Sequence, residues 1–114
     1  MANSRIIYKD YSLLESIPTS HKIGEKKVLL SNEETISNIT QLAISRLFAN
    51  DIVEEHVHPT MDEHYIITGG EGIMQIDNDS YEFKAGKFIL VPAGCCHNLV
   101  ATTDLEFITI SVSI

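Results

Sequence analysis

From residue 36 onward, the chain is built from short apolar or alternating stretches, each closed by a turn signal. Alternation with a period of two is typical of β-strands, because successive side chains point to opposite faces of a sheet. About eight short strands with turn signals roughly every 8–12 residues predict an all-β sandwich or barrel. Seven of these stretches follow residue 36, namely 41–48, 63–68, 73–77, 81–84, 87–91, 97–101 and 105–114.

The turn signals give the expected strand ends. Residues 69–72 (GGEG) and 85–86 (AG) are glycine-containing turns, and 92–94 (PAG) adds a proline. Residues 78–80 (NDS) are typical of the loop of a β-hairpin.

The first third of the chain is mixed. Residues 10–17 are expected to form a short helical turn that Pro18 ends. In the polar segment 20–35, the only apolar run is residues 28–30. We expect them to form a short strand, either at a sheet edge or exchanged with a partner. The length predicts a single domain over 1–114, with an arm and edge strand in 1–35 and a barrel in 36–114.

The charge of the chain argues against nucleic-acid and membrane-surface partners. The sequence has 16 acidic and 8 basic residues and a net charge of −8, which repels phosphate backbones and anionic lipids. The best basic patch, Lys22, Lys26 and Lys27, is small and is diluted by Glu25. We therefore expect a small-molecule ligand.

Two features favour a cytoplasmic location. No apolar run approaches the roughly 20 residues that cross a bilayer, and residues 1–10 lack the apolar centre of a signal peptide. Cys95 and Cys96 are adjacent, so on a strand they point to opposite faces and are not expected to form a structural disulfide. Free thiols agree with a reducing compartment.

The histidines predict a metal site. His56 and His58 lie on one face if their segment is a strand, and a bend at Pro59 brings Glu63 back toward them. His97 follows the turn at 92–94, far along the sequence from the other two histidines. Three imidazoles and one carboxylate suit one divalent transition metal, namely Fe, Mn, Ni, Zn or Cu, and leave open positions for a substrate. On its own, His-x-His is equally consistent with two surface histidines.

Two segments resemble the motifs of the cupin superfamily, in the right order. The first reads His56-Val57-His58, four residues, Glu63, six residues and Gly70. The second reads Gly86, five residues, Pro92-x-Gly94, two residues and His97. The motifs together span 50–101, nearly half of the chain.

The resemblance has two departures. Asn50 stands where the first motif opens with glycine, and Ala101 stands where the second closes with asparagine. Asparagine tolerates left-handed backbone angles and can serve the same turn. The resemblance implies a double-stranded β-helix, or jelly roll, with the metal inside, and a homodimer.

Strand parity predicts the direction of several side chains near the site. Tyr65 and Ile67 share the face of Glu63 and should point inward, whereas His64 should lie on the outer face. Tyr65 is a candidate catalytic or substrate-binding residue, with core packing as the alternative. Met61 is expected at the mouth of the cavity and Met74 in the core. At most one of Gln41 and Arg46 should face the cavity, because they have opposite parity on one strand. The large apolar and aromatic residues expected in the core or a dimer interface are Tyr81, Phe83, Phe88, Leu90 and Phe107.

Two groups of residues have open interpretations. Cys95 shares the parity of His97, so it is either a thiol near the metal or an ordinary buried cysteine. His21, with the three lysines of residues 22–27, either reaches a pocket across a dimer or forms a solvated face.

Three functions follow. The first is a metal-dependent enzyme acting on a small polar metabolite, as an Fe(II) dioxygenase or as a sugar-type isomerase or epimerase that uses the metal as a Lewis acid. Isomerisation needs a separate base, for which Tyr65 and His64 are the candidates. The second is a non-catalytic ligand-sensing or binding module. The third, a barrel without metal, is disfavoured by the presence of all four ligand types.

Overall fold

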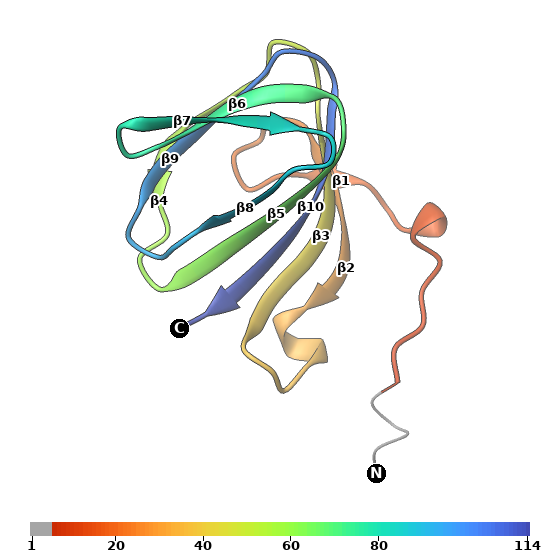
Figure 1. The fold of residues 1–114 in the computed structure, drawn as a ribbon. Coiled ribbons are helices and arrows are strands. Elements are labelled where there is room, and N and C mark those ends of the chain that lie inside the picture. Colours follow the sequence, from red (N-terminus) through yellow and green to blue (C-terminus); the bar gives the residue numbers. More distant parts are fainter. Residues whose placement is uncertain (1–5) are drawn as a thin grey trace.

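Nearly all of the regular structure is β-strand, arranged in two antiparallel sheets (Figure 1). The computed structural model describes residues 6–114. Residues 1–5 lie outside this described range. They belong to the segment 1–10, which is expected not to be a signal peptide. No helix in the described range is long and apolar enough to span a membrane. The elements are η2 (Tyr11–Leu13), β1 (Ile17–Pro18), β2 (Glu25–Ser31), η3 (Asn32–Glu34), β3 (Ile39–Leu47), β4 (Ile52–Val57), β5 (Met61–Gly69), β6 (Glu71–Ile76), β7 (Asp79–Lys84), β8 (Phe88–Val91), β9 (Cys96–Ala101) and β10 (Leu105–Ser113).

The sheets form the two walls of a jelly-roll barrel. One has the strand order β1-β2-β3-β10-β5-β8, and the other has the order β4-β9-β6-β7. All pairs are antiparallel, and most neighbours in a sheet are distant in sequence, as in β3 beside β10. The predicted all-β jelly-roll fold is confirmed.

The core lies between the sheets and is centred on aromatic rings. Phe83 and Phe107 meet edge to face at 5.1 Å between ring centroids, and Tyr65 lies 5.5 Å from Phe83. Burying one such side chain contributes about 1.5–3 kcal/mol. Ile67 and Met74 are each 1% exposed, so their predicted inward positions are confirmed.

Three of the side chains expected in the core or a dimer interface lie outside the core. Phe88 and Leu90 are 61% and 42% exposed, because they point away from the barrel on β8. Tyr81 is 45% exposed, close to the hairpin turn where β7 begins.

The structure corrects several element boundaries. The helical turn expected over 10–17 is only Tyr11–Leu13, since Leu14 already has extended backbone angles. The hairpin loop is Asp77–Asn78 rather than 78–80, with Asp77 at φ 53°. Gly72 belongs to β6, not to a turn. The strand expected at 28–30 is the longer β2, which pairs with β3 in the same chain.

Candidate metal centre

A β-bulge in β4 turns two histidines into the barrel. Val53 pairs with Leu99 and His56 pairs with His97, so β4 contains one more residue than β9 between these two pairs. Strict alternation from the inward Val53 would point Glu55 inward and His56 outward. The extra residue reverses this parity, as bulges do. The result is a row of histidines on the inner face.

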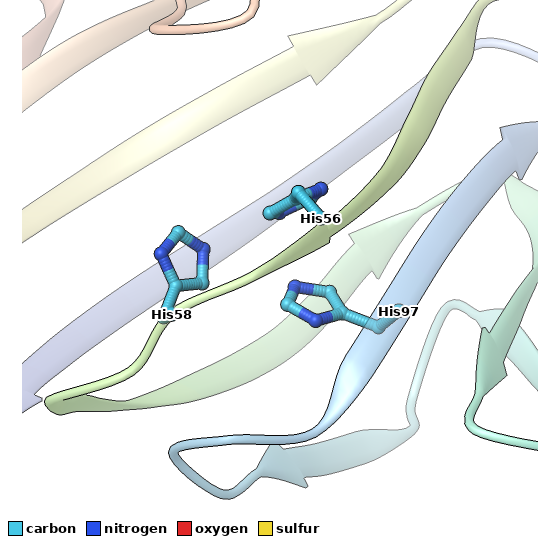
Figure 2. A group of neighbouring side chains, drawn as sticks. All are labelled: His56, His58 and His97. Atoms are coloured by element: carbon cyan, nitrogen blue, oxygen red, sulfur yellow. The ribbon is translucent and has the colours of Figure 1, made fainter.

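The three histidines converge on one point (Figure 2). His56 and His58 come from β4 and the residue just after it, and His97 comes from β9. One ring nitrogen from each lies within 4.8 Å of the others. The ring centroids of His56 and His97 are 4.2 Å apart. The side chains are therefore placed so that they could bind a metal ion.

Backbone carbonyls fix the orientation of two of these rings. His56 Nδ1 lies 2.8 Å from the carbonyl oxygen of Glu54, and His97 Nδ1 lies 3.2 Å from that of Cys95. A ring nitrogen that donates to a carbonyl leaves the other nitrogen with a free lone pair. Nε2 is then the nitrogen available to a metal.

Two Nε2 atoms, those of His58 and His97, are buried and have no hydrogen-bond partner in the described structure. His97 is only 2% exposed. Burial is the main cause that lowers the pKa of His97, and the neighbouring imidazoles of His56 and His58 lower it further. A lowered pKa keeps the imidazole neutral, which is the form that binds metals.

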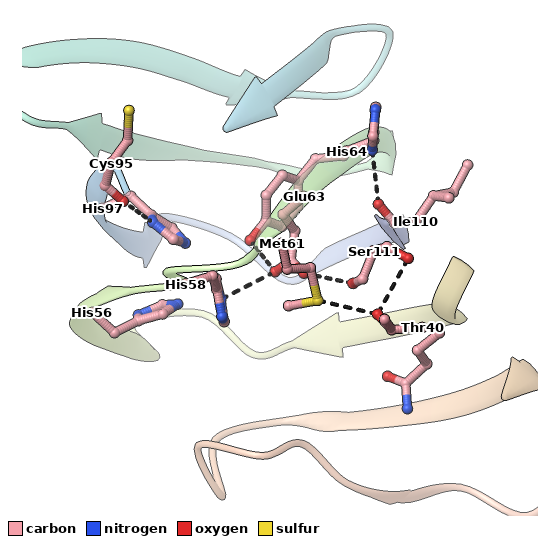
Figure 3. Close-up of polar contacts among 12 residues, drawn as sticks. Thr40, His56, His58, Met61, Glu63, His64, Cys95, His97, Ile110 and Ser111 are labelled. Carbon is pink, nitrogen blue, oxygen red and sulfur yellow. Dashed lines mark hydrogen bonds and ion pairs between the residues drawn. The ribbon is translucent and has the colours of Figure 1, made fainter. Parts of the chain in front are cut away.

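Glu63 lies beside the histidines and is held by two hydroxyl groups (Figure 3). Tyr65 Oη donates to Glu63 Oε1 at 2.8 Å, and Ser111 Oγ donates to Glu63 Oε2 at 2.6 Å. Glu63 Oε1 is 3.6 Å from His58 Nε2. Among the described residues, the compact group of potential ligands consists of the three histidines, and the predicted ligand Glu63 is not part of it.

Burial and the Glu63 carboxylate hold the pKa of Tyr65 well above its ordinary value. Its hydroxyl therefore stays protonated and donates to Glu63. His64 does not line the cavity. Its Nδ1 is hydrogen-bonded to the carbonyl oxygen of Ile110 on the neighbouring strand β10. Of the two candidate bases, only Tyr65 faces the site.

The site opens into a cavity of about 360 Å³ between the sheets. Met61 lines it, as predicted. Of Gln41 and Arg46, of which at most one was expected in the cavity, only Gln41 lines it. The wall combines apolar residues such as Met74 with hydroxyl groups such as Thr109.

The N-terminal segment contributes to the wall of the cavity. His21 reaches the cavity within its own chain, with its ring 4.2 Å from that of His56, and Lys26 lines the same cavity. Burial first, and then His56 and His58, lower the pKa of His21. His21 is an exposed residue at the wall of the cavity, and Lys22 is also exposed. Gly24, at φ 72°, lies in the turn between His21 and β2, but a glycine in a turn does not by itself indicate which way His21 points.

The cysteines and the departures from the cupin motifs have ordinary structural roles. Cys95 packs against the core, both thiols are free, and the three-histidine group includes neither. Asn50 has φ 74°, the left-handed conformation expected of it, and Ala101 is 1% exposed in the core.

A family model described as the cupin domain matches residues 46–113. An uncharacterized protein from Methanocaldococcus jannaschii is 39% identical over 44 residues, which are 39% of this chain and 35% of that protein. The matched part thus spans about a third of that relative.

Solved structures resemble the whole barrel. A predicted oxalate decarboxylase from Thermotoga maritima is 27% identical, covers 95% of this chain and 100% of its own, and has a TM-score of 0.83. An RmlC-like cupin from Shewanella frigidimarina is 16% identical, with coverages of 95% and 92% and a TM-score of 0.79. The second likeness shows the fold alone.

Proposed function

The chain belongs to the cupin family, and from this premise we propose that it binds one divalent transition metal through His56, His58, Glu63 and His97. We further propose that the metal site acts on a small polar metabolite in the adjoining cavity. The 27% identical neighbour is named as a predicted oxalate decarboxylase, which supports an enzymatic role.

The observation that carries this proposal is the pair of buried, unpartnered Nε2 atoms. A buried polar group without a hydrogen bond costs about 1–3 kcal/mol, and folded proteins seldom contain one. Here two such atoms, on His58 and His97, lie in one group of three histidines. Coordination to a cation would satisfy both lone pairs at once.

Glu63 completes the proposed ligand set. Its carboxylate would offset part of the charge of a dication, and its distance from His58 Nε2 needs only a small adjustment. Tyr65 and Ser111 would act as positioning residues, because their hydroxyl groups orient the carboxylate. Such outer partners commonly tune metal affinity.

Four protein ligands would leave room for a ligand from the cavity. When bound, the metal would supply a Lewis-acid centre and, as iron, would allow oxygen chemistry. Isomerisation or epimerisation needs a separate base, but His64 lies outside the cavity and the Tyr65 hydroxyl is engaged by Glu63. His21, which also lines the cavity, is a further candidate base. We therefore propose a dioxygenase-type reaction and an isomerisation or epimerisation as alternatives.

Metal analysis of protein purified without a histidine tag tests this proposal. Near-stoichiometric iron is expected for oxygen chemistry, whereas zinc, manganese or nickel would favour the Lewis-acid reaction. Metal together with ligand binding, but no turnover of any candidate substrate, would favour a non-catalytic binding or sensing module. Protein that takes up no metal, with a stability that chelator does not change, would refute the metal site.

We also propose a homodimer in a reducing compartment such as the cytoplasm. Ile66 on β5 and Phe88 on β8 are paired, both are exposed, and Leu90 extends the same outer face. Covering this apolar face would be favourable. Light scattering should give the mass of a dimer, and Phe88→Glu should reduce it to that of a monomer. The free thiols of Cys95 and Cys96 agree with the compartment.

A further inference from the structure

Lys26 places an ammonium group in the wall of the cavity. Lys26 pairs with Ser45 across β2 and β3, and both residues line the cavity. Its Nζ donates to Gln41 Oε1 at 2.9 Å. It forms no ion pair with a carboxylate of residues 6–114. An ammonium group has three donor hydrogens, so two remain for a ligand.

A row of polar side chains connects this ammonium group with the metal site. Gln41 pairs with Ser111 across β3 and β10, and Ser111 pairs with Glu63 across β10 and β5. All three line the cavity. Gln41 and Glu63 are two strand spacings apart, roughly 10 Å along the sheet. A ligand a few carbon atoms long would therefore span from the metal to Lys26.

The wall of the cavity contains one cationic and one anionic side chain, although the protein as a whole is acidic. Among its lining residues, Lys26 is the only lysine or arginine and Glu63 is the only carboxylate. A bound dication would outweigh Glu63, and Lys26 would add to the excess of positive charge. A partly desolvated ammonium group is stabilised most by a hydrogen-bonded anion.

Resting on the proposed metal site, we infer that the ligand is a small organic dicarboxylate. One carboxylate would occupy an open metal position, and Lys26 would bind the other. Lys26 and the neighbouring His21 precede the segment matched by the family model, 46–113. This specificity is therefore a property of the N-terminal segment of this chain.

Binding of malonate, succinate and glutarate to metal-loaded protein, measured by calorimetry, tests the inference. Lys26→Met removes the charge and keeps most of the length, and Lys26→Arg keeps the charge. Lys27→Met is the matched control, because Lys27 pairs with the outward Ile44 and its Nζ donates to the carbonyl oxygen of Tyr11. The corresponding diamides serve as neutral probes of equal length.

We expect at least one dicarboxylate to bind, with affinity about tenfold weaker in Lys26→Met. Lys26→Arg and Lys27→Met should stay within a few-fold of wild type, and the diamides should not distinguish the variants. Metal content is measured on the same samples. Full metal content with no dicarboxylate binding, or with equal binding by Lys26→Met, would overturn this inference alone. Protein without metal would overturn the proposed function and this inference together.

Discussion

Replacing His58 by alanine should abolish metal uptake and leave the barrel folded. The His58 side chain is 26% exposed, and its Nε2 is buried without a partner. Removing the ring loses about 1 kcal/mol of apolar burial and removes an unsatisfied group that costs about 1–3 kcal/mol. In the absence of metal, the free energy of unfolding of the variant should therefore lie within about 2 kcal/mol of that of wild type.

The difference should appear when metal is added. A ligand at a thousand times its dissociation constant stabilises the folded state by about 4 kcal/mol. For a chain of this length, that corresponds to a rise in Tm of roughly 15 °C. Wild type should show this rise, and His58→Ala should show almost none.

The assay combines thermal unfolding, with and without Fe(II), Mn(II) or Zn(II), with metal analysis after gel filtration. His64→Ala is the matched control, because His64 lies on the outer side of β5 and bonds the carbonyl oxygen of Ile110. Full metal content in His58→Ala would refute its role as a ligand. Unfolding of the metal-free variant at room temperature would refute the claim that the apolar core holds the fold by itself.

The other predictions concern pH, the support of the metal ligand and the backbone. Burial lowers the pKa of His97 in the folded state. The metal-free protein should therefore lose stability as pH falls below about 6.5, because the unfolded state then binds a proton that the folded state does not. His97→Phe should reduce the dependence of the unfolding free energy on pH, measured by urea titrations at several pH values. Tyr65→Phe removes the donor to Glu63 and should weaken metal affinity about tenfold in a chelator competition, whereas unchanged affinity would contradict its positioning role. Gly70→Ala should cost more than about 2 kcal/mol in urea unfolding, because its φ is 79° and a Cβ would overlap a backbone carbonyl of the loop before β10. Gly86→Ala, with φ 93° and open space around it, should cost about 1 kcal/mol.

Much of the fold and the candidate site could be predicted from local patterns. Alternation and turn residues predicted most barrel strands, since side-chain direction in a strand depends only on sequence parity. Parity also predicted the inward Tyr65 and the outward His64. The spacing of His56, His58 and His97 predicted that they gather, through the resemblance to the cupin motifs.

Pairing between distant segments decided the rest. The bulge in β4 exists only because β9 lies beside it, and it determines that His56 faces inward although parity counted from Val53 points it outward. One of the two hydrogen bonds to the Glu63 carboxylate depends on β10, which brings Ser111 next to it. Likewise, no local pattern in residues 20–27 shows where His21 and Lys26 point, because their place in the cavity follows from the pairing of β2 with β3. The sequence by itself determined most of the strands and the types of candidate ligand, whereas the tertiary structure decided which faces of β2 and β4 line the candidate metal site, because strand pairing and the bulge set them.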